Sequence, residues 1–122
     1  MGTVLVVDDD VSVVRLISLI LSLEQISVYG AHSAEEGLDA LDRQADDPDL
    51  ILLDLAMPGM DGREFYRRAR LAGYAGPVIF CSSYGAADAN RELGGQGAIE
   101  KPFDPEMLAA TVRNQLAGLR TK

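Results

Sequence analysis

Short apolar runs alternate with segments of helical periodicity along the whole chain. Continuous hydrophobic stretches typical of strands lie near 3–8, 27–31, 49–54, 77–82 and 97–100. The segments between them predict helices at 11–23, 34–45, 62–72, 86–93 and 105–117. The strands at 4–7 and 50–53 are apolar without alternation, as strands buried on both faces are. The pattern therefore predicts an α/β fold in which helices cover both faces of a parallel sheet.

Local chemistry marks several helix ends. Ser33, with Glu36 three residues later, forms a capping box that predicts the start of the second helix. Asp61 stands before the third helix and is interpreted as its start rather than as a metal ligand. Gly73 and Gly118 follow helical segments, so we expect helices to stop at these positions.

Length and composition predict one globular domain. The chain has 122 residues, of which 48% are hydrophobic and 25% charged, as in ordinary folded proteins. We expect a single domain over residues 1–122 and no output domain, because only six residues follow Leu116.

The formal charge of −8 argues against direct binding of nucleic acid, which needs a concentrated positive face. The one basic cluster consists of Arg63, Arg67, Arg68 and Arg70, which we interpret as a solvated helix face. No segment approaches the roughly 18 apolar residues of a membrane span. We therefore expect a cytoplasmic protein without membrane insertion.

The single cysteine, Cys81, excludes an internal disulfide and is compatible with a reducing compartment. It lies in the apolar run 77–81, which favours a buried, unreactive side chain.

Polar side chains follow four of the predicted strands. Asp8 and Asp9 follow the first strand, Asp54 ends the third, Ser82 ends the fourth and Lys101 follows the fifth. In an open parallel sheet, ligands bind in a crevice outside the carboxyl ends of the strands. We therefore expect these five side chains to share one site.

Several carboxylates held close together repel one another unless a cation lies among them. Magnesium prefers one or two carboxylates, a carbonyl oxygen, waters and a phosphate oxygen. Asp8, Asp9, Asp54 and the backbone carbonyl of Ala56 would supply the protein ligands. The sequence thus predicts a Mg²⁺ site at this edge of the sheet.

A metal beside Asp54 would also neutralise an incoming phosphoryl group, so that the carboxylate could attack phosphorus and form an acyl phosphate. Lys101 would pair with the phosphoryl oxygens, and Ser82 would donate a hydrogen bond to them. The pattern favours phosphorylation on aspartate.

Four motifs in this order carry a resemblance to a known family. They are Val-Leu-Val-Val-Asp-Asp-Asp at 4–10, Asp-Leu-Ala-Met-Pro-Gly-Met-Asp-Gly at 54–62, Pro-Val-Ile-Phe-Cys-Ser-Ser at 77–83 and Glu-Lys-Pro-Phe at 100–103. From about Val4 to Leu116 the chain resembles the receiver domain of two-component response regulators. The resemblance implies a flavodoxin-like, doubly wound five-stranded parallel sheet in the order 2-1-3-4-5, with five helices.

The resemblance also implies a role for each residue of the expected site. Asp54 would take a phosphoryl group from a sensor histidine kinase or a histidine phosphotransfer protein, while Asp8 and Asp9 hold Mg²⁺. Ser82 matches the hydroxyl residue that turns toward the phosphoryl group, and Lys101 matches the lysine that contacts it. The chain would be a signalling phosphoacceptor rather than an enzyme.

Signalling is expected through a shift of the surface formed by 82–103, read by a downstream effector or an attached output domain. A homodimer formed on phosphorylation is a further candidate partner. The resemblance implies a cis peptide bond before Pro102. It also implies an aromatic ring three residues before the lysine, which swings inward when the hydroxyl residue moves toward the phosphate. Ala98 stands at this position, so the signal cannot be transmitted by such a ring. Tyr84 would either replace this ring or shield the acyl phosphate from water, and we favour shielding.

Other readings stay open. A phosphatase of the haloacid dehalogenase type would need a second aspartate where Ala56 stands. A docking module that never accepts phosphate would not need the acid cluster. Asp8 and Asp10 could instead cap the helix that begins at Val11, and we leave Asp10 out of the metal ligands. His32 is isolated and receives no role.

Overall fold

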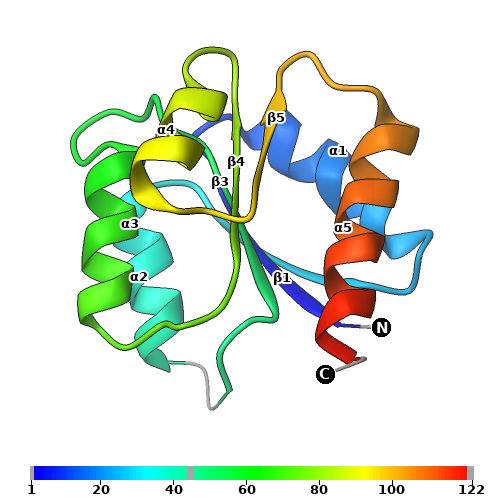
Figure 1. Ribbon diagram of the computed structural model, residues 1–122, viewed down its shortest axis with the longest axis horizontal. Helices are drawn as coiled ribbons and strands as arrows, with labels where there is room; N and C mark the ends of the chain where they lie inside the picture. Colours follow the sequence, from blue (N-terminus) through cyan, green and yellow to red (C-terminus); the bar gives the residue numbers. More distant parts are fainter. Residues whose placement is uncertain (1, 44–45, 121–122) are drawn as a thin grey trace.

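Five strands and five helices alternate in the computed structural model, which describes residues 2–43 and 46–120 (Figure 1). The strands are β1 (Thr3–Val7), β2 (Ser27–Ala31), β3 (Leu50–Leu53), β4 (Val78–Ser82) and β5 (Gly97–Glu100). The helices are α1 (Val11–Ser22), α2 (Ala34–Arg43), α3 (Gly62–Leu71), α4 (Ala86–Leu93) and α5 (Pro105–Arg120). The predicted order of elements is confirmed, and the predicted helical residues 44–45 lie outside the described ranges.

The strands form one parallel sheet in the order β2-β1-β3-β4-β5. Helices α1 and α5 cover one face, and α2, α3 and α4 cover the other (Figure 1). Since neighbouring side chains on a strand point to opposite faces, the apolar run of β1 supplies two cores. Val4 and Val6 pack with α1 and α5, while Leu5 and Val7 pack toward α2, α3 and α4. This explains why the strand lacks alternation.

Helix starts follow the local signals. Asp10 caps α1, because its Oδ1 accepts hydrogen bonds from the backbone N–H groups of Ser12 (2.9 Å) and Val13 (3.4 Å). Asp61 caps α3 and accepts from the N–H of Glu64 at 3.0 Å, which confirms its interpretation as a helix start. Each such cap contributes about 1 kcal/mol of stability.

One predicted helix end is wrong. Gly73 has φ +106° just after α3, as a residue ending a helix should, but Gly118 lies within α5, which continues to Arg120. Glycine permits the left-handed conformation without requiring it. Its cost of about 1 kcal/mol in a helix does not stop propagation when the neighbouring residues favour the helix.

The interpretation of the arginine cluster as a solvated face holds for only part of it, because Arg63 and Arg70 are half-buried. Arg67 and Arg68 are exposed, but Arg70 is half-buried and stacks over the rings of Tyr66 (4.8 Å) and Tyr74 (5.5 Å). Its guanidinium also donates to the carbonyl oxygen of Tyr74 at 2.8 Å. Arginine combines a charge with a flat face that packs on aromatic rings, which charge patterning alone does not register.

In the part of the chain that the structure describes, no helix has the length and hydrophobicity needed to cross a bilayer.

The first residue of α3 lies directly against the backbone that follows β3. A Cβ built on Gly62 would lie 2.2 Å from the carbonyl oxygen of Asp54 and 2.8 Å from the Cα of Leu55. Both contacts are with backbone atoms, so a side chain here would have to displace the end of β3. Glycine at this position therefore keeps α3 close to the candidate site.

We expect Gly62→Ala to lower the free energy of unfolding by about 1–3 kcal/mol, because the added methyl overpacks the backbone at Asp54. Gly118→Ala is the matched control, since its Cβ would meet nothing within 4 Å. This control should be neutral or slightly stabilising. Urea denaturation of both variants measures the difference, and equal stabilities would contradict the packing argument.

Candidate functional site

Four strand ends meet at one edge of the sheet and form a cavity of about 240 Å³. Backbone hydrogen bonds align these ends: the N–H of Asp8 donates to Ala31 at 3.0 Å, and the N–H of Asp54 donates to Val7 at 2.9 Å. The N–H of Lys101 donates to the carbonyl oxygen of Ser82 at 3.1 Å. The cavity is lined by Asp8, Asp9, Asp10, Asp54, Ala56, Ser82, Ser83, Tyr84 and Lys101.

Three carboxylates converge in this cavity. Asp8, Asp9 and Asp54 each offer an oxygen within 4.8 Å of the others. Asp8 is 2% exposed and Asp54 6% exposed, whereas Asp9 is open to solvent. Oxygen ligands at such spacing suit a hard divalent cation, with the exposed side leaving room for water ligands. The residues present therefore fit a Mg²⁺ site.

Lys101 provides the positive charge at the bottom of the cavity. Its Nζ lies 2.5 Å from Oδ2 of Asp8 and 3.6 Å from Oδ1 of Asp54. Burial acts to lower the pKa of Lys101, but the hydrogen bond and charge of Asp8, together with the charge of Asp54, outweigh burial and raise it. The ammonium therefore keeps its proton at neutral pH. The Lys101–Pro102 peptide bond is cis, as the family resemblance implied.

Burial raises the pKa of Asp54, and the negative charge of Asp8 raises it further. The charge of Lys101 and hydrogen bonding by the Ser82 side chain and the Ala56 backbone lower it only in part. One ammonium thus serves two buried carboxylates, so the site has an excess of negative charge. A divalent cation among the three aspartates would remove this excess.

The remaining residues of the wall have clear local environments. Ser82 is 1% exposed at the end of β4, whereas Tyr84 is 89% exposed at the rim of the cavity. Asp10 also lines the cavity, but its carboxylate caps α1. Ser83, the second hydroxyl residue of the 77–83 motif, also lines the cavity, although the sequence predicts a role only for Ser82. Residue 98 lies in β5 beside Phe80 and does not line the cavity.

Cys81 is buried and free, which confirms the predicted burial of its side chain. Burial raises the pKa of its thiol to about 12, so the reactive thiolate is scarce at neutral pH.

The five-stranded parallel sheet with an acidic site at its carboxyl edge is typical of a receiver domain, and comparison with known proteins agrees. A model of the response regulator receiver domain matches residues 4–113. The chain belongs to this family, whose members are signalling phosphoacceptors.

Curated relatives match most or all of the chain. It is 31% identical to sporulation initiation phosphotransferase F of Bacillus subtilis (strain 168), with 93% of this chain and 92% of that protein covered. It is 33% identical to the uncharacterized transcriptional regulatory protein YkoG of the same organism, with coverages of 99% and 54%. It is 35% identical to the transcriptional regulatory protein CpxR of Escherichia coli (strain K12), with coverages of 93% and 48%. The chain therefore spans about half the length of the latter two proteins.

Solved structures agree with the fold. A CheY-like response regulator receiver domain protein from Methanospirillum hungatei JF-1 is 25% identical, with a TM-score of 0.88 over 99% of this chain and 98% of that one. A BeF3-activated DrrB receiver domain is 27% identical, with a TM-score of 0.82 over 96% of this chain and 98% of that one. The predicted strand order 2-1-3-4-5 with five helices is confirmed.

The raised pKa of Asp54 predicts a pH-dependent effect on stability in the metal-free protein. The folded state favours the protonated carboxyl group of Asp54 over the ionised one. The stability that this group contributes is therefore present at low pH and is lost as the pH rises through the folded-state pKa. In EDTA at pH 7, Asp54→Asn should therefore unfold several degrees higher than the wild type. This advantage should shrink as pH falls toward the ordinary aspartate pKa.

Thermal unfolding between pH 4 and pH 8, followed by circular dichroism, measures this difference. Asp10→Asn is the control, because asparagine also caps helices and Asp10 is exposed. If Asp54→Asn unfolded at a lower temperature than the wild type across the whole pH range, burial of the ionised carboxylate would not be destabilising.

Proposed function

We propose that Asp54 accepts a phosphoryl group, with Mg²⁺, from a sensor histidine kinase or a histidine phosphotransfer protein of a two-component phosphorelay. One observation carries the proposal. The carboxylate of Asp54 is buried beside a second carboxylate, that of Asp8, with the Lys101 ammonium 3.6 Å away, at the floor of an open cavity. This arrangement suits an oxygen nucleophile whose product carries more negative charge.

In the proposed transfer, an oxygen of Asp54 forms a bond to phosphorus as the bond from phosphorus to the donor histidine nitrogen breaks, and the neutral imidazole leaves after taking up a proton. Asp8, Asp9, Asp54 and the backbone carbonyl of Ala56 would hold Mg²⁺. When bound, the ion supplies charge neutralisation for the phosphoryl oxygens. These assignments come from the chemistry of the donor set and from the resemblance to the family.

Lys101 and Ser82 would act on the product. Lys101 lies between the two buried carboxylates, so its ammonium can shift toward a phosphoryl oxygen without leaving the cavity. The Ser82 hydroxyl is at the end of the neighbouring strand and can donate a hydrogen bond to another oxygen. Both interactions are stronger with the phosphorylated state than with the free carboxylate. They would therefore bias the loops that follow β4 and β5.

The two alternative functions are less well supported. An aspartate-dependent phosphatase needs a general acid two residues after the nucleophile, and the methyl group of Ala56 cannot donate a proton. A docking module without phosphorylation leaves the convergence of three carboxylates and a buried ammonium unexplained. The formal charge of −8 likewise supports no direct contact of this domain with nucleic acid. A cytoplasmic location is proposed because the single, free Cys81 is compatible with a reducing compartment.

The downstream effector or output domain would read the surface formed by 82–103. Besides apolar packing in a shared core, two polar contacts join its helix, α4, to α3: Arg63 pairs with Glu92 at 2.5 Å, and the Tyr66 hydroxyl donates to the carbonyl oxygen of Leu93 at 2.9 Å. Glycines with positive φ flank this helix on both sides. A helix tied at a few points between permissive residues can shift as one body.

Tyr66 offers a route for the signal in a chain that has Ala98 at the expected aromatic position. Its ring packs against Phe80 of β4, with 5.6 Å between centroids, and Phe80 lies two residues before Ser82. The hydroxyl of the same side chain reaches the end of α4. A movement at the end of β4 would thus reach α4 through Tyr66.

The proposed acceptor is tested with acetyl phosphate as the phosphodonor and mass spectrometry as the readout. We expect labelling of the wild type that depends on Mg²⁺ and is abolished by EDTA or by Asp54→Asn. Asp9→Asn should raise the Mg²⁺ concentration needed by at least about ten-fold, because a direct ligand is lost. Asp10→Asn, which changes an exposed cap, should leave labelling unchanged. Labelling of Asp54→Asn at another residue would refute the assignment.

The proposed readout is tested with Tyr66→Phe, which removes the bond to Leu93 but keeps the ring on Phe80. We expect this variant to lose about 0.5–1.5 kcal/mol of stability. Its amide signals at 86–94, without phosphate, should move toward those of the beryllofluoride-activated wild type. Tyr29→Phe, on the half-exposed edge strand, is the control. Unmoved α4 signals would exclude Tyr66 from the route.

A further inference from the structure

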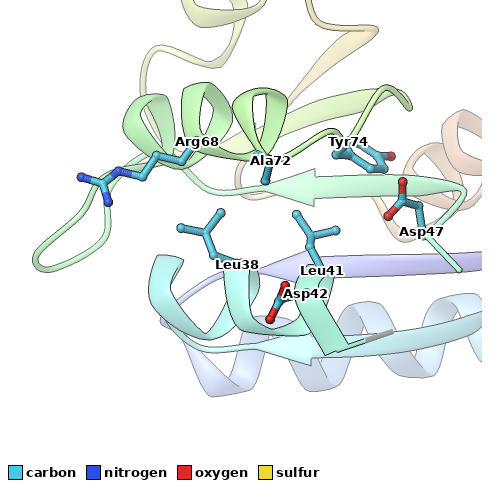
Figure 2. Close-up of a pocket in the computed structure, with 8 residues that line it drawn as sticks. Leu38, Leu41, Asp42, Asp47, Arg68, Ala72 and Tyr74 are labelled. Carbon is cyan, nitrogen blue, oxygen red and sulfur yellow. The ribbon is translucent and has the colours of Figure 1, made fainter. Parts of the chain in front are cut away.

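A second hollow lies between α2 and α3, at the end of the sheet opposite to the acidic cavity. It is a groove of about 300 Å³. Leu38 and Leu41 project from α2 toward α3, and Ala72 faces them at the end of α3 (Figure 2). We call this hollow the α2/α3 groove. Its walls come from the last turns of two helices and from the segments that lead into β3 and β4.

The two ends of the α2/α3 groove differ in charge. Arg68 stands at one end, and Asp47 and the ring of Tyr74 stand at the other, while Asp42 lies beside Leu41 on the α2 wall (Figure 2). The guanidinium of Arg68 already pairs with Glu64 at 2.9 Å. Within residues 2–43 and 46–120, the carboxylates of Asp42 and Asp47 make neither a hydrogen bond nor an ion pair. Among the described residues that line the groove, two carboxylates thus lack a hydrogen bond or ion pair, whereas the one arginine is already paired.

We propose that the α2/α3 groove binds a short segment of a partner protein that carries a leucine-sized apolar side chain beside lysine or arginine. The apolar side chain would lie between Leu38, Leu41 and Ala72. The basic side chain would reach the carboxylates of Asp42 and Asp47.

Charge and size select this occupant. The formal charge of −8 attracts a basic partner from a distance and opposes a second acidic copy of the chain. A volume of about 300 Å³ accommodates one or two side chains and lies at the lower limit for small-molecule pockets. Asp42 and Asp47 are exposed, as rim charges of a protein interface are, whereas small-molecule sites enclose their polar groups.

Binding at the groove would be independent of phosphorylation. The groove is formed by segments that enter β3 and β4, whereas Asp54 and Ser82 lie where these strands end. The same sheet would therefore carry a tethering surface at one end and the phosphoacceptor at the other. The inference stands without the proposed function.

The test uses three capped pentapeptides titrated into the ¹⁵N-labelled protein and followed by NMR. Gly-Lys-Leu-Lys-Gly carries both features, Gly-Glu-Leu-Glu-Gly reverses the charge, and Gly-Lys-Ser-Lys-Gly lacks the apolar side chain. We expect the first peptide to shift the amide signals of Leu38, Leu41, Ala72 and Tyr74. The other two should bind at least about five-fold more weakly, since each lacks one of the two contributions.

Variants locate the site. Asp42→Asn and Asp47→Asn should each lower the affinity for the first peptide about two- to five-fold, as the loss of a surface charge does. Asp39→Asn is the matched control, because Asp39 lies on the same helix, outside the groove lining, and pairs with Arg43 at 2.6 Å. Ala72→Leu should weaken binding at least about ten-fold by filling the groove. Because Ala72 is exposed with helical dihedral angles, this variant should keep its fold.

Several outcomes would overturn the proposal. One is equal affinity for the acidic and basic peptides, and another is signal shifts confined to the acidic cavity. Leucinamide that bound as tightly as the basic peptide would identify a small molecule as the occupant. Self-association of the wild type that Ala72→Leu abolishes, measured by sedimentation, would identify a second copy. Asp54→Asn should bind the peptide with unchanged affinity, so failure of the phosphoacceptor assignment would not affect this result.

Discussion

The ammonium of Lys101 between the buried carboxylates of Asp8 and Asp54 is the interaction on which the site depends. Two carboxylates removed from water repel each other, and one cation compensates only part of their charge. Burial, and next the charge of Asp8, therefore raise the pKa of Asp54. A buried site with an excess of negative charge suits a divalent cation. In the proposed function, this cation and Lys101 would also neutralise the phosphoryl group on Asp54.

The parallel sheet makes this arrangement possible. Its hydrogen bonds bring the ends of β1, β3, β4 and β5 to one edge, so residues far apart in the chain become neighbours. The buried strands supply the rigidity that keeps like charges close together. The absence of a side chain at Gly62 lets α3 pack directly against the backbone of Asp54. Stability and function therefore depend on the same short segment after β3.

The two ends of the sheet serve different purposes in our account. At the carboxyl end, charge compensation links Asp54 to α4 through β4, Phe80 and Tyr66. At the opposite end, the α2/α3 groove presents apolar walls and two carboxylates that have no ion pair with any residue the structure describes. A domain of this size has few surfaces that a partner can read. Separating a switching surface from a tethering surface would let one partner stay bound while another responds.

Periodicity determined the order of elements and the α/β class, and the polar residues at the strand ends predicted which side chains converge, because local patterns report burial and polarity directly. The strand order was implied by the resemblance to the receiver family. Two predictions from single residue types were wrong. Arg70 stacks over the rings of Tyr66 and Tyr74, which charge patterning does not register, and α5 continues past Gly118 because a glycine permits a helix end without requiring one. Only the tertiary structure decided the distances around Lys101, the link from Tyr66 to α4 and the α2/α3 groove. Each of these depends on how separate elements pack, which no local pattern along the chain encodes.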